Sequence, residues 1–244
     1  MTDRPLAIVT GATGAMGRCT VENLVATHDV VALGRNEEVL AELAELDGVT
    51  THAVALSDHA GLAAVVEPLE RIDVLVHVAA ISVRFTVETA TADDWREHFE
   101  TNVIAPAELT RLALPRLRES QGTVIFIGSG ASRVPAPGHA VYTASKHALL
   151  GLANTLRIDE ANTGVRVSTI APGPTNSGMM RSMQAQAGDD YNEDHYLMPE
   201  SIAQAVRYVV DAPADAQITD VSVRPRIEVH LRKDGEASKP RRSA

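Results

Sequence analysis

Near its N-terminus the chain reads Leu6-Ala7-Ile8-Val9-Thr10-Gly11-Ala12-Thr13-Gly14-Ala15-Met16-Gly17. The first five residues form a short apolar run with β-branched members, which predicts a buried strand. A glycine-rich turn follows, and then a helical stretch to about His28. In this context such glycines let the backbone approach a pyrophosphate, whose charge lies at the helix N-terminus. The alternative is a glycine turn without a ligand, but the order of strand, turn and helix favours a dinucleotide site.

Strand and helix patterns alternate along the rest of the chain. Further apolar runs predict six more strands, at residues 30–33, 49–56, 72–78, 122–127, 165–170 and 218–223. This alternation predicts an α/β protein with a single doubly wound parallel sheet of about seven strands, a Rossmann fold, with helices on both faces. We expect one domain over residues 1–230 and a disordered tail at residues 231–244, which are polar and basic.

The end of the second predicted strand bears on the choice of cofactor. It reads Gly34-Arg35-Asn36. An NAD site usually places an acidic residue here to hold the ribose 2′-hydroxyl, whereas an arginine suits the 2′-phosphate of NADP. Glu37 and Glu38 come next, but they are typical of the first turn of a helix that Asn36 caps. Arg35 therefore favours NADP(H) over NAD(H), the alternative being an ordinary exposed arginine.

Composition narrows the class of protein further. The 244 residues carry a net charge of −10, which argues against a nucleic acid or an anionic membrane as partner. One cysteine excludes a disulfide framework, no histidine pair has the spacing of a metal site, and His77 is interpreted as an internal histidine. The chain has no run of 18 apolar residues and no signal-peptide pattern at Met1. We therefore expect a cytoplasmic protein without a metal.

Tyr142 and Lys146 are four residues apart on a predicted helix, so they lie on one face of it, one turn apart. A nearby ammonium lowers the pKa of a phenol because it favours the phenolate. A phenol with a lowered pKa can exchange a proton near neutral pH, as general acid–base catalysis requires. The same spacing also occurs on many solvated helices. Ser129 ends the fifth predicted strand, at the edge where parallel sheets bind ligands.

Two segments interrupt the regular pattern. A long helix is predicted from a cap at Asp93-Asp94 to about Glu119, and Pro106 inside it removes a backbone hydrogen bond and should kink it near Asn102. The alternative is that a second helix begins there. Residues 176–198 have no clear period, which predicts a lid or binding loop. The candidates for its pocket wall are Met179, Met180, Met183, Tyr191 and Tyr196.

Together these residues resemble the short-chain dehydrogenase/reductase family over residues 5 to about 226. The elements that match, in the family's order, are the glycine turn, Asn102, Ser129, Tyr142-x-x-x-Lys146 and Pro172-Gly173-Pro174-Thr175. The gap of 13 positions from Ser129 to Tyr142 matches the family's catalytic spacing. The resemblance implies that Tyr142 is the acid/base and that Ser129 hydrogen-bonds the substrate oxygen. It also implies that Lys146 lowers the tyrosine's pKa and holds the nicotinamide ribose, while Asn102 anchors a water of a proton relay.

The cofactor half departs from the family's short branch. Ala15 stands at the middle glycine of Thr-Gly-x-x-x-Gly-x-Gly, so the turn fits the Thr-Gly-x-x-Gly-x-x-Gly of the extended branch of epimerases and nucleotide-sugar enzymes. His77-Val78-Ala79-Ala80 replaces Asn-Asn-Ala-Gly, and Ala55-Leu56 replaces Asp-Val near the adenine. The chain is too short for a separate substrate domain, however, and its Ser–Tyr–Lys region resembles the short branch. The segment 220–225 is similar to reductases related to serine and 3-hydroxy acid dehydrogenases.

The resemblance implies an NADP(H)-dependent oxidoreductase that interconverts a secondary alcohol and a ketone or aldehyde of a small molecule. Two alternatives remain open: a non-catalytic NADP-binding sensor, and an epimerase or dehydratase with tightly held nucleotide. Helices at 106–119 and 142–160 are expected to pair in a homodimer or homotetramer. The residues expected to bind the cofactor are Gly11, Thr13, Gly14, Ala15, Met16, Gly17, Arg35, Asn36, Leu56, Ala79, Ala80, Tyr142, Lys146, Pro172, Gly173 and Thr175.

Overall fold

A computed structural model describes residues 4–229, in which seven parallel strands form one sheet. The strands lie in the order β3-β2-β1-β4-β5-β6-β7. They are β1 (Leu6–Thr10), β2 (Asp29–Gly34), β3 (Val49–Ala53), β4 (Val74–His77), β5 (Thr123–Ile127), β6 (Arg166–Pro172) and β7 (Asp220–Val223). The prediction of a doubly wound parallel sheet of about seven strands is confirmed, although the strand ends differ by a few residues. The tail predicted at 231–244 lies outside the described residues.

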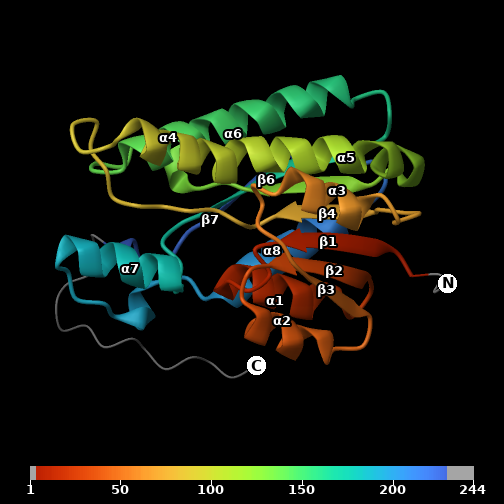
Figure 1. Ribbon diagram of the computed structural model, residues 1–244, viewed down its shortest axis with the longest axis horizontal. Coiled ribbons are helices and arrows are strands. Elements are labelled where there is room, and N and C mark those ends of the chain that lie inside the picture. The colour runs from red at the N-terminus through yellow and green to blue at the C-terminus, as the bar shows by residue number, and fades with distance from the viewer. Residues whose placement is uncertain (1–3, 230–244) are drawn as a thin grey trace.

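Helices cover both faces of the sheet (Figure 1). They are α1 (Ala15–Leu24), α2 (Glu37–Ala44), α3 (His59–Val66), α4 (Ala92–Phe99), α5 (Ala105–Ser120), α6 (Ala140–Asp159), α7 (Gly178–Ala187) and α8 (Pro199–Val210). In Figure 1, α3, α4, α5 and α6 lie above the sheet, α1 and α2 lie below it, and α7 stands apart at the left. Within residues 4–229, none of the helices combines the length and apolar character needed to cross a membrane.

The central strand β1 is buried on both faces, because successive side chains of a strand point to opposite sides. Val9 packs in one core cluster with Leu24 of α1 and Val206 of α8. Ile8 packs in the other cluster with Leu109 of α5. The chain winds away from β1 in both directions, since β2 lies on one side of β1 and β4 on the other. The carboxyl ends of β1 and β4 therefore border the crevice where sheets of this topology bind ligands.

The turn after β1 depends on two glycines that permit close packing. Gly11 has a φ of +64°, and a Cβ there would lie 2.8 Å from the backbone of Ala79. A Cβ on Gly17 would lie 2.1 Å from the carbonyl oxygen of Gly11. Gly14, by contrast, has ordinary extended dihedrals, and its Cβ would lie 3.4 Å from the same oxygen. Gly11 and Gly17 are therefore required for α1 to pack against the turn, whereas Gly14 is not required by its backbone conformation.

The predicted long helix is divided into three segments. After α4 the residues Glu100–Ile104 form a π-helical segment, and α5 follows. Pro106 lies in the first turn of α5, directly after the π segment. The regular helix is therefore interrupted near Asn102, and the interruption is the π segment that contains this residue. The helix cap also differs from the expectation, since Thr91 caps α4 in a capping box with Asp94.

The segment 176–198 contains a helix, α7, that the sequence pattern did not indicate. Ser177 caps it by accepting a hydrogen bond from the backbone N–H of Met180 at 3.2 Å. None of its residues is buried, and its three methionines line the cavities described below, so this helix does not pack on the apolar core. The expectation that Tyr191 and Tyr196 form pocket wall is also wrong. Their rings stack at 4.8 Å between centroids, their hydroxyls bond Asn176 and Gln184, and neither lines a cavity described below.

The contact between Gly17 and Gly11 leads to a prediction about stability. Gly17→Ala should lower the free energy of unfolding by about 1–3 kcal/mol, because the new methyl group overlaps backbone that cannot move freely. Gly14→Ala is the matched control. It should cost less than about 1 kcal/mol, since glycine is only a moderately better helix cap than alanine. Urea unfolding of the three proteins measures both effects, and equal losses in the two variants would contradict this view of the turn.

Candidate active site

Two cavities adjoin at the carboxyl ends of the strands. The first, of about 450 Å³, lies between the glycine turn, the ends of β2 and β4, and α6. The second, of about 680 Å³, lies between the ends of β5 and β6 and the helix α7. The residues that line both are Met16, Gly128, Tyr142, Ser177 and Met179. Tyr142 is the one titratable side chain among them, so a proton on its hydroxyl can reach ligands in either cavity.

The hydroxyl of Tyr142 is hydrogen-bonded to Ser129. Ser129 follows β5, and its Oγ also accepts a hydrogen bond from the backbone N–H of Ala131 at 3.1 Å. Burial raises the pKa of Tyr142, and the hydrogen bond from Ser129 opposes this rise. The expected lowering of the tyrosine's pKa by Lys146 is therefore wrong for this structure. The Lys146 ammonium lies 5.8 Å from the ring centroid, and the loss of water around the phenol is the largest influence on the pKa of Tyr142.

Lys146 is almost completely buried, with 2 % of its surface exposed. Its Nζ donates a hydrogen bond to the carbonyl oxygen of Ile127 at 2.9 Å. An ammonium has three donors, and within residues 4–229 no second acceptor for Nζ is found. Burial lowers the pKa of Lys146 to about 8. Since Lys146 also lines the first cavity, its remaining donors can serve a hydroxyl-bearing ligand there.

Asn102 fixes the position of two segments around this group. Its side chain is fully buried in the π segment. Its Oδ1 accepts from the N–H of Ile81 at 2.9 Å, and its Nδ2 donates to the carbonyl of Ile81 and to Ser145 Oγ, both at 3.0 Å. Ser145 Oγ in turn donates to the carbonyl of Tyr142 at 2.8 Å. Asn102 thus ties the segment after β4 to the helix turn that carries Tyr142, and the relay water remains a prediction.

Most of the residues expected to bind the cofactor do line the first cavity. They are Gly11, Thr13, Gly14, Ala15, Met16, Gly17, Arg35, Leu56, Ala79, Ala80, Tyr142 and Lys146. Four residues do not. Asn36 is turned to the N-terminus of α2, where its Oδ1 accepts from the N–H of Val39 at 3.1 Å. Pro172, Gly173 and Thr175 line the second cavity instead, because β6 continues to Pro172 and carries the turn beyond it to the other side.

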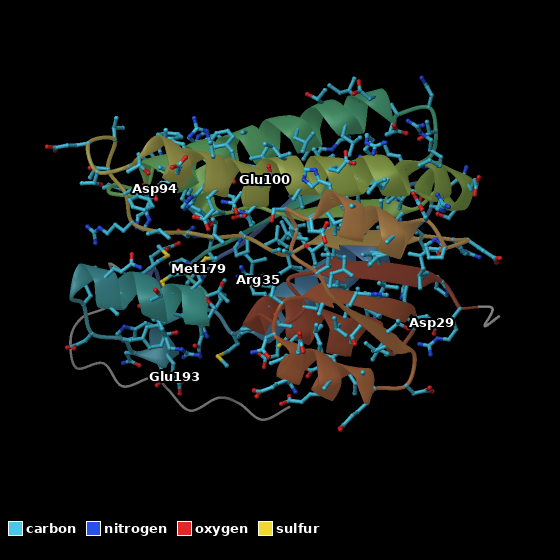
Figure 2. All side chains as sticks on the ribbon, viewed as in Figure 1. Asp29, Arg35, Asp94, Glu100, Met179 and Glu193 are labelled. Carbon is cyan, nitrogen blue, oxygen red and sulfur yellow. The ribbon has the colours of Figure 1, made fainter. Side chains whose placement is uncertain are left out.

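Several lining residues were missed in the sequence. Ser177 and Gly178 bring the N-terminus of α7 to the first cavity, beside Met179, which was expected there as pocket wall. Figure 2 labels Arg35 at the end of β2 and Met179 on α7, which reach this cavity from different elements. The second cavity also has polar or charged residues that were not singled out as site residues: Arg133, His139, Asp220, Ser222 and Arg224. Only Ser177 had a local signal, as a serine before a stretch without helix-breaking residues.

His77 is an internal histidine, as interpreted from the sequence. Its Nε2 lies 2.8 Å from Thr110 Oγ1, and its ring stacks on Phe126. Burial lowers its pKa to about 3, so the ring is neutral at physiological pH. In the described part of the chain, no three side chains of His, Cys, Asp or Glu gather closely enough to hold a metal ion.

A parallel doubly wound sheet, with a glycine turn at the first strand and a Ser–Tyr–Lys group facing the same crevice, defines a Rossmann-fold protein of the oxidoreductase type. The family model for short chain dehydrogenases matches residues 5–188. The chain belongs to this family, which confirms the resemblance inferred from its motifs.

Known relatives agree with this assignment over nearly the whole chain. The NADP-dependent 3-hydroxy acid dehydrogenase YdfG of Salmonella typhi is 32% identical over 234 residues, which cover 90% of this chain and 94% of the relative. Among solved structures, a Corynebacterium glutamicum protein assigned to the family is 41% identical with a TM-score of 0.70, covering 91% of this chain and 100% of that one. Serine dehydrogenase from Escherichia coli is 30% identical with a TM-score of 0.77, covering 89% and 96%. A closed serine dehydrogenase complexed with NADP+ is 27% identical with a TM-score of 0.82, covering 97% and 100%.

The buried Lys146 gives the stability of the protein a specific pH dependence. Its folded pKa of about 8 lies below the unfolded value of about 10.4. Between these values the unfolded chain binds more protons, so Lys146 makes the free energy of unfolding rise with pH. Lys146→Met removes this contribution. The stability difference, variant minus wild type, should fall by about 2 kcal/mol between pH 8 and 10. Urea unfolding across this range tests it, and a constant difference would contradict the lowered pKa.

Proposed function

We propose that the protein is an NADP(H)-dependent oxidoreductase that interconverts a secondary alcohol and a ketone or aldehyde. The observation that carries this proposal is the position of Tyr142, whose hydroxyl bonds Ser129 and lies where the two cavities meet. In the proposed arrangement the cofactor lies in the first cavity and the substrate in the second. Tyr142, which lies where the two cavities meet, then faces the reacting carbon and its oxygen.

The first cavity suits a dinucleotide with a 2′-phosphate. Helix α1 begins beside it with no side-chain cap and with no acidic residue in its first turn, so its N–H groups and the positive end of its dipole are available to a pyrophosphate. Arg35 is exposed at the mouth of this cavity, and its guanidinium has no hydrogen-bond or ion-pair partner among the described residues. Relatives named as NADP-dependent or complexed with NADP+ support the same choice of cofactor.

NADPH, when bound, supplies a hydride to the carbonyl carbon. The chain's own residues act on the oxygen of that carbonyl. Ser129 donates a hydrogen bond to it, and Tyr142 gives it a proton as negative charge develops. Burial raises the pKa of Tyr142, which keeps the phenol protonated and ready to act as an acid at neutral pH. The Lys146 ammonium stabilises the phenolate that remains, and the reverse steps oxidise an alcohol.

Asn102 acts in this proposal as a positioning residue. It touches neither cavity directly, since neither lining includes it. Its hydrogen bonds to Ile81 and Ser145 hold the helix turn of Tyr142 against the segment after β4. The names of the relatives, a 3-hydroxy acid dehydrogenase and a serine dehydrogenase, support CH–OH and C=O groups of small molecules as the substrate class.

We further propose a homodimer or homotetramer formed through α5 and α6, which lie above the sheet in Figure 1. Ile104, at the end of the π segment, is 46% exposed, and Ile158 on α6 is 76% exposed. A second copy packed on this layer would cover both side chains.

Tyr142→Phe provides the direct test of the proton donor. The substitution removes one hydroxyl from the site, so turnover of a ketone with NADPH should fall by roughly 10²- to 10⁴-fold. NADPH binding, followed by fluorescence, should change little because the ring is kept. Tyr208→Phe is the control, since Tyr208 lies on α8 and is 63% exposed. Full turnover in Tyr142→Phe would refute the assignment. NADPH binding without consumption across a broad carbonyl panel would favour the sensor, and cofactor that co-purifies unconsumed would favour the epimerase.

Arg35→Asp tests the 2′-phosphate site. Losing an arginine–phosphate contact should weaken NADPH binding about 10- to 100-fold while NADH binding changes much less. Arg226→Asp makes the same charge change at an exposed residue outside both cavities and should not alter the preference. Dissociation constants for both nucleotides decide the matter. An unchanged ratio of the NADPH and NADH dissociation constants in Arg35→Asp would show that Arg35 does not bind the 2′-phosphate.

A further inference from the structure

The second cavity has an uneven distribution of charge. Met179, Met180 and Met183 of α7 and the small residues after β5 and β6 form apolar wall. The charged side chains in its lining are Arg133, Asp220 and Arg224. A cavity of this kind holds an apolar body and recognises one polar or charged group at a fixed place. The question is which of these charges remains available to a ligand.

Arg224 presents an open edge of its guanidinium to this cavity. Its Nε and Nη2 donate to the two oxygens of Glu228 at 2.8 and 2.7 Å. This side-on pairing orients the planar group and uses two of its five N–H donors. Among the described residues, Nη1 has no hydrogen-bonding partner. Glu228 therefore positions the arginine without occupying the edge formed by Nη1.

Two glycines let the arginine lie directly on the loops of the site. A Cβ on Gly130 would lie 2.9 Å from Nη1 of Arg224, and a Cβ on Gly173 would lie 3.4 Å from its Nε. The guanidinium is thus packed between the loop after β5 and the turn after β6. Gly130 directly follows Ser129, whose hydroxyl bonds Tyr142. Arg224 accordingly lines the same cavity as Ser129 and Tyr142, which hold the proposed position of the substrate oxygen.

The other titratable groups of the cavity do not occupy the open edge of Arg224. Asp220 accepts a hydrogen bond from Arg133 at 2.6 Å and another from Thr169, so its charge is already paired. His139 also lines the cavity, and its Nδ1 is buried without a partner among the described residues. Burial and the nearby Arg84 lower the pKa of His139, so it is a neutral polar group at pH 7. The cavity therefore offers the open Nη1 edge of the oriented Arg224 guanidinium and the unpaired Nδ1 of His139.

We propose that Arg224 binds a carboxylate of the substrate, and that the preferred substrates are oxo acids and the corresponding hydroxy acids. The inference rests on the proposed function, since it places the reacting carbonyl at Ser129 and Tyr142. Arg224 is then the specificity-determining residue of the second cavity. An arginine held by a second carboxylate is well suited to this role, because little side-chain entropy remains to be lost when the substrate binds.

A matched pair of substrates tests this assignment. The probes are 3-oxobutanoate and its ethyl ester, which share the ketone but differ in charge. The wild type should reduce the acid with the higher kcat/KM. In Arg224→Met the ratio of kcat/KM for acid over ester should fall about 10- to 100-fold, as expected for a lost charged hydrogen bond. Arg224→Lys should recover part of the ratio. Arg226→Met, two residues away and outside both cavities, should leave it unchanged.

These measurements distinguish a failure of the carboxylate-binding role of Arg224 from a failure of the proposed oxidoreductase function. A preference for the ester in the wild type, or an unchanged ratio in Arg224→Met, would overturn the role of Arg224 while leaving the oxidoreductase intact. NADPH binding shows whether each variant is folded. If Arg224→Met does not fold, inhibition of the wild type by propanoate but not by propanamide supports the anion site, and equal inhibition overturns it. No NADPH consumption with these ketones or a neutral panel would instead refute the proposed function.

Discussion

The site depends on how closely helix α1 packs against the turn that follows β1. The carbonyl of Gly11 lies where a Cβ of Gly17 would be, and Gly11 itself lies against the backbone of Ala79 after β4. This contact fixes the relative positions of three segments: the start of α1, the end of β1 and the segment beyond β4. Thr10 reinforces it, since its Oγ1 accepts hydrogen bonds from the N–H groups of Val78 and Ala79 at 3.1 and 3.2 Å. The first cavity exists because these backbones meet without side chains between them, which leaves the uncapped N-terminus of α1 open to an anion.

On the other side of the crevice, the position of Tyr142 depends on a chain of buried polar contacts. Asn102 binds Ile81 and Ser145, and Ser145 binds the carbonyl of Tyr142. The π segment supplies the local widening of the helix that carries Asn102, and such segments are frequent at functional sites. Burial has opposite effects on the two titratable partners, because it disfavours the charged form of each: it raises the pKa of Tyr142 and lowers that of Lys146. In the proposed mechanism this keeps the proton on the phenol until charge develops on the substrate oxygen.

The sheet and the main site residues could be predicted because each leaves a local pattern. Strands buried on both faces give apolar runs, and the glycine turn, Ser129 and Tyr142-x-x-x-Lys146 have fixed spacings. Helix α7 was not predicted, since none of its residues is buried in the core and its methionines face a cavity instead. The direction in which the pKa of Tyr142 shifts was missed, because sequence spacing reveals a neighbouring charge but not the loss of water around the phenol. That Pro172, Gly173 and Thr175 line the second cavity, and that Arg224 reaches it too, could not be predicted, because both depend on how β6 and the segment after β7 meet in space.

In the proposed function, the two cavities bring a nicotinamide and a carbonyl together at Tyr142. The most direct measurement follows deuterium from NADPH labelled at C4 of the nicotinamide into the product of a ketone that the protein consumes. We expect one deuterium at the carbinol carbon, from one face of the nicotinamide, and one NADP+ formed for each alcohol. Product without deuterium at that carbon, or product formed without accumulation of NADP+, would contradict it.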